Sequence, residues 1–171
     1  TTDLGPERLM NYELSWKHWV MAGRLSYGVN VFYMKGWDVI QTAMVNGARI
    51  NANVGDVENV GVEAQMDYRI TSSWSLATNH SYLHMDVPVL SAPTYKGYLG
   101  AHYREGRWSA QAGVQYVAGL YTAVGANEQK EDYCLLSALV SHRVWKGLTL
   151  WLRGETLLGY RNYETILGYP M

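Results

Sequence analysis

The chain has 171 residues, enough for one domain, and its net charge of −1 at pH 7 gives no sign of a nucleic-acid partner. Its aromatic residues are 14 Tyr and 7 Trp against one Phe. Tyr and Trp combine an apolar ring with a polar group, so they are favoured where one end of a side chain is wet and the other is not. This composition is typical either of a membrane interface or of an ordinary β-rich core.

The single cysteine, Cys134, excludes an intrachain disulfide and a zinc site built on several thiolates. It lies in an alternating apolar pattern, so we expect a buried or lipid-facing thiol. No run approaches the roughly 18 apolar residues of a membrane helix, and the mean hydropathy of −0.19 suits a soluble protein or a β-barrel equally. Residues 1–6 lack the features of a signal peptide, so we expect a mature segment if the protein is exported.

The dominant pattern has a period of two. From Val60 to Ile70 every even position is apolar, and the odd positions are Gly, Glu, Gln, Asp and Arg. A strand places such residues on opposite faces, whereas a helix scatters them. The pattern recurs along the chain and predicts an all-β protein without a helix of useful length. The eight predicted strands cover residues 9–21, 24–35, 57–70, 74–86, 94–104, 107–119, 132–145 and 148–158.

The connections between these strands alternate in length. Four are tight and rich in Gly or Ser, at residues 22–23, 71–73, 105–106 and 146–147, whereas those at 36–56, 87–93 and 120–131 are long. Short turns on one rim and long loops on the other are typical of an antiparallel up-and-down transmembrane barrel. With eight strands and a tight first turn, we expect Thr1 and Met171 to lie together on the long-loop rim.

The two predicted faces differ in character. Three strands carry aromatic pairs eight residues apart: Trp74 with Tyr82, Tyr95 with Tyr103, and Trp108 with Tyr116. At the rise of a tilted strand this spacing spans roughly 20 Å, near the height of a lipid-facing band with an aromatic girdle at each edge. We expect Val62, Ala64, Met66, Val114 and Tyr116 to face outward. The opposite, lumen-facing set is polar: Lys17, Glu63, Gln65, Asp67, Asn79, Lys96, His102, Arg104, Gln111, Gln115, Arg153 and Glu155.

No catalytic, cofactor or metal site is predicted. His80 and His84 share a strand face but lie about 13 Å apart by the strand rise, too far to bind one metal ion, and Asp86 continues their row toward a loop. Glu63 and Asp67 have the same separation, so they form no carboxylate pair. The charged segment 127–132 is interpreted as solvated surface.

Several segments resemble those of TonB-dependent outer-membrane receptors. The similarity lies in Leu4-Gly5-Pro6-Glu7 followed by Asn11-Tyr12-Glu13, in Asn53-Val54-Gly55 followed by Asn59-Val60-Gly61-Val62-Glu63, in Ala92-Pro93-Thr94-Tyr95-Lys96, in residues 115–122 and in the tail from Gly154 to Met171. The tail departs from the family pattern at Thr156, where Asn is usual. Gly55 and Gly61 suit bulges or a close backbone approach. Five such segments in order cover nearly the whole chain.

The resemblance implies that residues 1–171 are the C-terminal portion of a larger transmembrane barrel, without its plug domain and its final strand. It implies a place in the outer membrane of a Gram-negative cell, in contact with lipid, and a transport role without enzymatic activity. The expected process is TonB-driven uptake of a scarce nutrient, with an iron–siderophore complex as the default and cobalamin or an oligosaccharide as alternatives. The TonB complex would act through the plug domain.

Two other functions stay open from the sequence. One is a free-standing eight-stranded barrel that binds a small ligand, which would need an apolar interior. The other is a small membrane-barrel enzyme, for which His84 with Asp86 is the only hint. If the chain is a piece of a larger barrel, we expect it to bind no nutrient alone and to self-associate through the unpaired edges of its first and last strands.

Overall fold

The computed structural model describes residues 4–45, 48–53 and 55–158. Within them the protein is all-β apart from one short 3-10 turn, Met21–Gly23. Ten strands are present: β1 (Arg8–Val20), β2 (Leu25–Trp37), β3 (Ile40–Val45), β4 (Ala48–Asn53), β5 (Val57–Arg69), β6 (Trp74–Met85), β7 (Pro93–Glu105), β8 (Trp108–Ala123), β9 (Gln129–Trp145) and β10 (Leu148–Gly154). The described part of the chain contains no helix long and apolar enough to cross a membrane.

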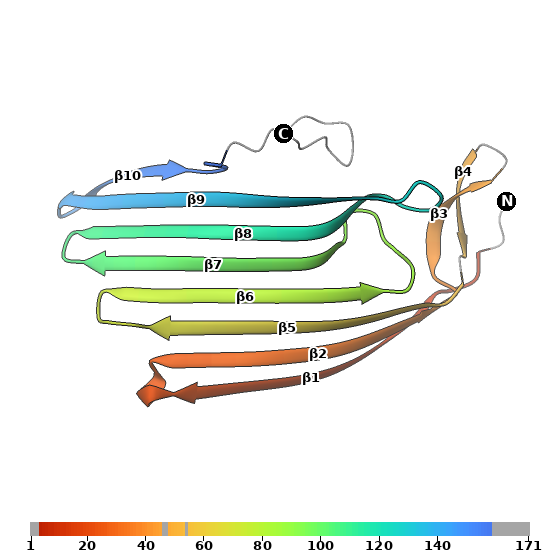
Figure 1. The fold of residues 1–171 in the computed structure, drawn as a ribbon, viewed down its shortest axis with the longest axis horizontal. Coiled ribbons are helices and arrows are strands. Elements are labelled where there is room, and N and C mark those ends of the chain that lie inside the picture. The colour runs from red at the N-terminus through yellow and green to blue at the C-terminus, as the bar shows by residue number, and fades with distance from the viewer. Residues whose placement is uncertain (1–3, 46–47, 54, 159–171) are drawn as a thin grey trace.

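Eight of these strands form one antiparallel sheet in the order β1-β2-β5-β6-β7-β8-β9-β10. Each pairs with its neighbour along the chain, except that the small sheet β3-β4 is inserted between β2 and β5. The predicted eight-strand, up-and-down arrangement is therefore confirmed. Figure 1 shows the tight turns at one end of the sheet and the long connections, with the β3-β4 hairpin, at the other.

Local chemistry explains the tight turns. Ala22 and Gly23 adopt positive φ angles of 53° and 80°, and Gly106 and Gly147 adopt 58° and 97°. Glycine reaches this region without a steric cost, so it suits such turns. In the turn before β6, the Thr71 hydroxyl accepts hydrogen bonds from the backbone N–H groups of Ser73 and Trp74, at 3.1 and 3.0 Å.

The connection predicted over residues 36–56 needs correction, because it contains the β3-β4 hairpin. The sequence carried a signal for it: Asn46-Gly47, a dipeptide typical of two-residue hairpins, follows the apolar-rich stretch 40–45. The predicted loop at 120–131 is also too long, since β8 runs to Ala123 and β9 begins at Gln129. The last predicted strand, in turn, ends at Gly154, before residue 158.

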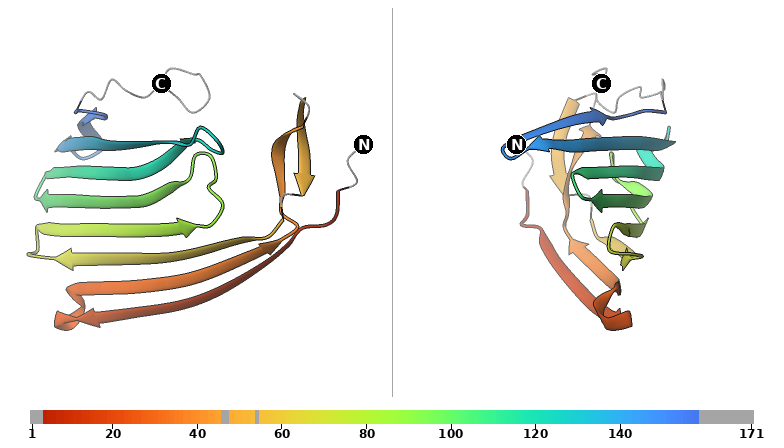
Figure 2. Two further views of the ribbon diagram at one scale, coloured as in Figure 1. Left: turned by 45° about the vertical axis from the view of Figure 1, so that its right-hand side comes forward. Right: turned by 90° about the vertical axis from the view of Figure 1, so that its left-hand side faces the viewer.

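The main sheet is open, with β1 and β10 at its two edges in the described residues. It does not form the closed eight-stranded barrel that the small-ligand alternative requires. Figure 2 shows the sheet curved and twisted from one edge to the other. The prediction for Thr1 and Met171 falls on residues outside the described ranges. Of the described ends, β1 begins at the long-connection end of the sheet, and β10 runs back toward it (Figure 1).

The sheet buries very little. Among the described residues, the buried hydrophobic side chains are Val57, Val117, Leu120 and Tyr121, which lie at the long-connection half of the sheet. A soluble domain of this size has a contiguous core of many apolar side chains. Here the large apolar residues are instead exposed along the strands, so the two faces of the sheet are its functional surfaces.

Candidate functional site

Strand register assigns the alternating residues to two faces. Val62 lies opposite Val31 on one side and Tyr82 on the other, and Ala64 lies opposite Val29 and His80. Glu63 lies between Asn30 and Ser81, and Gln65 between Gly28 and Asn79. Because partners in register share a face, the register confirms the predicted separation of Val62, Ala64, Met66, Val114 and Tyr116 from Glu63, Gln65, Gln111 and Gln115.

The first face, called the apolar face below, extends from β1 to β10. Its exposed residues include Leu14, Val29, Val31, Val62, Leu99, Val114, Val140, Leu150 and Leu152, with exposed fractions from 38% for Val114 to 79% for Leu152. Soluble monomers rarely leave an apolar surface that runs across a whole sheet. The arrangement suits contact with an apolar medium.

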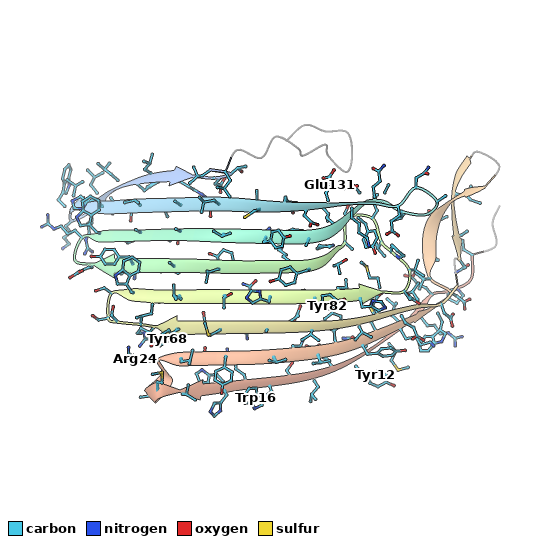
Figure 3. The ribbon with its side chains drawn as sticks, viewed as in Figure 1. Tyr12, Trp16, Arg24, Tyr68, Tyr82 and Glu131 are labelled. Atoms are coloured by element: carbon cyan, nitrogen blue, oxygen red, sulfur yellow. The ribbon has the colours of Figure 1, made fainter. Side chains whose placement is uncertain are left out.

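Two rows of aromatic side chains border this face. Toward the long connections lie Tyr12, Tyr33, Tyr82, Tyr95 and Tyr116, and nearest the turns of β6 to β8 lie Trp74, Tyr103 and Trp108. On β1 and β2, Trp16 and Tyr27 lie at the register of Tyr116 and Val114. In each of the three eight-residue pairs predicted from sequence, one ring lies toward the long connections and the other toward the turns. Within rows the rings touch: the centroids of Trp74 and Tyr103 lie 4.9 Å apart. Figure 3 shows Tyr12 and Tyr82 toward the long connections.

One polar cluster interrupts the apolar face at His80. Its Nδ1 lies 2.7 Å from the Tyr95 hydroxyl, and its Nε2 lies 2.9 Å from the Thr78 hydroxyl. Thr78 donates its only hydroxyl proton to the Tyr98 carbonyl at 2.6 Å, so His80 Nε2 is the donor to Thr78. In the tautomer that carries its proton on Nε2, Nδ1 accepts from the Tyr95 hydroxyl. Each polar group is therefore paired inside the cluster, as an apolar setting requires.

The opposite face, called the polar face below, carries hydrogen-bonded side chains. Ser15 donates to the Asn30 side-chain oxygen at 2.8 Å, and Asn30 donates to Glu63 at 3.3 Å. The predicted polar positions on the strands, from Lys17 on β1 to Arg153 on β10, share this face by register. Glu155 follows the end of β10 and forms an ion pair with Arg153.

At the long-connection end, Asn53 joins three chain segments. Its side-chain oxygen accepts the Gly5 N–H at 2.9 Å, and its amide donates to the carbonyls of Gly5 and Asp38. Asn53 thus fastens the base of the β3-β4 hairpin to the segment before β1. Nearby, Lys35 on β2 and Glu58 on β5 form an ion pair at 2.6 Å.

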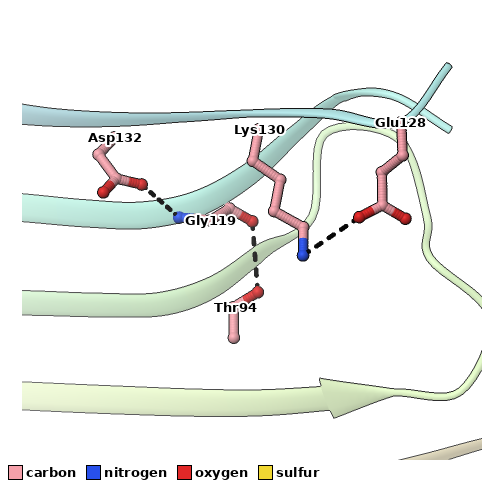
Figure 4. A network of polar contacts seen from close by, with 5 residues as sticks. All are labelled: Thr94, Gly119, Glu128, Lys130 and Asp132. Carbon is pink, nitrogen blue, oxygen red and sulfur yellow. Dashed lines mark hydrogen bonds and ion pairs between the residues drawn. The ribbon is translucent and has the colours of Figure 1, made fainter.

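Segment 127–132, interpreted as solvated surface, is a loop only up to Glu128, because β9 begins at Gln129; Asp132 lies within β9, as predicted, and is exposed. Its carboxylate accepts the backbone N–H of Gly119 at 2.7 Å, where the β8-β9 register shifts and Gly119 adopts a φ of 62°. The Gly119 carbonyl in turn accepts from the Thr94 hydroxyl at 3.3 Å, while Lys130 pairs with Glu128 (Figure 4). A bulge leaves a backbone donor without a ladder partner, and sequence alone did not identify Asp132 as its acceptor.

The structure separates the residues weighed for chemistry. His80 bonds Thr78 and Tyr95, whereas His84 lies opposite Val60, farther along β6. Asp86 caps the backbone N–H of Val87 at 2.7 Å. Cys134 is half-buried on the apolar face, opposite Tyr116. Among the described residues, no three His, Cys, Asp or Glu side chains are grouped so that they could hold a metal ion.

Comparison with known proteins gives consistent results. Residues 1–157 match the family model for the TonB dependent receptor-like β-barrel. A curated relative, the ferric-pyoverdine 358 receptor of Pseudomonas putida, is 20% identical over 183 residues, which cover 96% of this chain and 22% of the relative.

Among solved structures, the copper transporter OprC has a TM-score of 0.77 at 18% identity over 91% of this chain and 26% of that chain. The ferric-catecholate import receptor Fiu of E. coli K12 has a TM-score of 0.70 at 20% identity over 92% and 24%. The ferripyoverdine receptor of the Pseudomonas aeruginosa outer membrane has a TM-score of 0.69 at 16% identity over 91% and 24%.

These likenesses confirm the fold as a set of strands from a TonB-dependent receptor barrel, and the chain spans about a quarter of the length of the proteins it matches. Since the family model covers all but the last 14 residues, the chain belongs to the family of TonB-dependent receptor β-barrels, which are transport receptors.

Proposed function

We propose that this chain forms part of the wall of an outer-membrane receptor, with its apolar face against lipid and its polar face toward the barrel interior. The observation that carries the proposal is the apolar face itself, exposed across eight strands and bordered by two aromatic rows. In transmembrane barrels an apolar band between two aromatic girdles faces the bilayer, and the interior is polar. A sheet with this polarity would expose its apolar surface to water in any soluble setting.

The proposal extends to the rest of the receptor. Residues 1–171 would form the C-terminal portion of the barrel, while the plug domain and the final strand would come from the rest of the polypeptide. Within the described ranges, β1 and β10 are the two edges of the sheet, and a neighbouring strand at each edge would pair with the backbone groups on its outer side.

The nutrient we propose is a ferric siderophore, taken up with energy delivered through TonB. Support comes from the relatives, which include a ferric-pyoverdine receptor, a ferric-catecholate import receptor and a ferripyoverdine receptor. The similarity to the copper transporter OprC makes copper the second cargo to compare. The role is binding and transport, and no step of the proposal requires catalysis.

The test uses the complete receptor containing this chain, expressed in a strain deleted for it. Uptake of radioactive iron is measured with ferric pyoverdine and with a ferric catecholate, and uptake of copper is measured in parallel. The proposal predicts saturable iron uptake that is restored by the receptor and lost when TonB is removed. TonB-dependent copper uptake without iron uptake would identify copper, and not a ferric siderophore, as the transported nutrient. TonB-independent transport, or transport of neither metal, would contradict the proposal.

A further inference from the structure

The polar face carries a group of basic side chains near the tight turns. Arg69 at the end of β5 and His102 and Arg104 on β7 line a depression of about 350 Å³. Its other lining residues include Ser73, Ser75, Ser109 and Gln111, and no Asp or Glu lines it. The depression therefore combines two guanidinium groups, an imidazole and several neutral hydrogen-bond donors.

Strand pairing brings these residues together from four strands. Ser75 lies opposite Arg69 on one side and His102 on the other, and His102 lies opposite Gln111. Two strand spacings separate Arg69 from His102 by about 10 Å, and two residues of strand separate His102 from Arg104 by about 7 Å. An anion of a few atoms bound between Arg69, His102 and Arg104 would lie within reach of all three side chains.

Among the described residues, no carboxylate forms an ion pair with these basic side chains. The ion pairs found among the described residues are Lys35–Glu58, Lys130–Glu128 and Arg153–Glu155, all elsewhere. Glu105 is next to Arg104 in sequence, but it lies on the other face and accepts the Tyr103 hydroxyl at 2.6 Å. Asp67 shares the face with Arg69 but forms no ion pair with it within the described ranges. Adjacent cations of one sign attract an anion.

A second depression extends this basic surface toward β10. It shares Arg104 and Ser109 with the first and adds Arg107, Arg143 and two hydroxyl residues, Ser141 and Thr149. Here one guanidinium nitrogen of Arg107 donates to the Val144 carbonyl and one of Arg143 to the Gly106 carbonyl, at 3.1 and 3.4 Å. These bonds hold the two side chains while leaving further donors on each guanidinium.

We propose that Arg69, His102 and Arg104, with the adjoining serines, form an oxyanion site that takes a carboxylate or a phosphate group. Guanidinium groups bind such oxygens in a two-pronged geometry, and hydroxyl donors complete the coordination. The site lies on the face opposite the apolar band, so a lipid headgroup at the membrane surface is not its ligand. The anion comes either from solution or from a carboxylate side chain elsewhere in the receptor.

The experiment uses the complete receptor in detergent and compares two double variants with equal loss of charge. R69Q/R104Q removes the two guanidinium groups, and K17Q/K96Q removes two cations from the same face at a distance from the site. The midpoint of thermal unfolding is measured against inorganic phosphate, with chloride adjusted to hold ionic strength constant.

If the anion comes from solution, phosphate raises the midpoint of the wild type and of K17Q/K96Q saturably, and at least tenfold more phosphate is needed for R69Q/R104Q. If the receptor supplies the carboxylate, phosphate has no effect, but R69Q/R104Q unfolds at a lower temperature than K17Q/K96Q. That difference then disappears in 1 M NaCl, because salt screens the pairing. Equal behaviour of the two double variants in both arms overturns the proposal.

Discussion

At the scale of single residues, glycines determine where the rings of the polar face lie. The Tyr98 ring covers Gly100 and Gly113, and a Cβ atom at these positions would lie 2.4 and 2.7 Å from the Tyr98 hydroxyl oxygen. The Phe32 ring covers Gly61 in the same way. The sequence predicted either a bulge or a close backbone approach at Gly61, and the structure shows the close approach. The ring that makes the approach could not be predicted, since it comes from another strand.

Gly100→Ala should lower the free energy of unfolding by about 1–3 kcal/mol, because the added methyl group displaces the Tyr98 ring. In a Tyr98→Ala background the same substitution should cost much less. Both are measured by denaturant titration of the complete receptor, with Ala101→Gly as a control on the opposite face. If Gly100→Ala costs the same stability with and without the Tyr98 ring, the position of that ring does not depend on Gly100.

Asp132 provides a second residue-scale prediction. Asp132→Ala removes the acceptor of the Gly119 N–H, and because this hydrogen bond is exposed the loss should cost about 0.5–1 kcal/mol of stability. Asp132→Asn retains a side-chain oxygen and should cost less. If Asp132→Ala is as stable as the wild type, the carboxylate does not support the bulge.

At the scale of elements, the strands were predictable because period-two alternation and turn chemistry agree along most of the chain. The eight strands of the main sheet and all four tight turns are where the sequence places them. The strand ends toward the long connections were less predictable. There β8 and β9 continue beyond the apolar band, and their pairing depends on the Gly119 bulge and on contacts between distant segments.

The β3-β4 hairpin depends on one such contact. Asn53→Ala removes the hydrogen bonds to Gly5 and Asp38, so it should increase the opening of the hairpin base. Faster amide hydrogen exchange over residues 38–53 measures this, while exchange in β5 and β6 should stay unchanged. Unaltered exchange at the hairpin base would contradict the role assigned to Asn53.

Substitutions at two neighbouring positions of β5 test which face of the sheet meets lipid, through their effect on the free energy of unfolding. Ala64→Arg places a charge on the apolar face and should cost roughly 2–4 kcal/mol if residue 64 lies near the bilayer midplane. Gln65→Arg places the same charge on the polar face and should cost far less. Folding titrations of the complete receptor into lipid vesicles compare the two, and equal losses would contradict the assignment.

At the scale of the whole molecule, the sheet is one part of a wall. Its edges β1 and β10 are unpaired with each other, its buried core is small, and its two faces have opposite polarity. The sequence predicted this polarity because alternation is a local property. It could not predict a ligand site, because the residues around any depression on the polar face come from several strands whose register only the fold defines.

Whether the apolar face lies against lipid is tested most directly by measuring the lipid exposure of each face in the complete receptor in bilayers. Spin labels are attached in a Cys134→Ser background through Val62→Cys and Val114→Cys on the apolar face, and through Gln65→Cys and Gln111→Cys on the polar face. Labels at 62 and 114 should collide with lipid-dissolved oxygen and be shielded from a water-soluble nickel complex. Labels at 65 and 111 should show no such lipid exposure. Lipid exposure at 65 and 111, or water exposure at 62 and 114, would show that the apolar face does not lie against lipid.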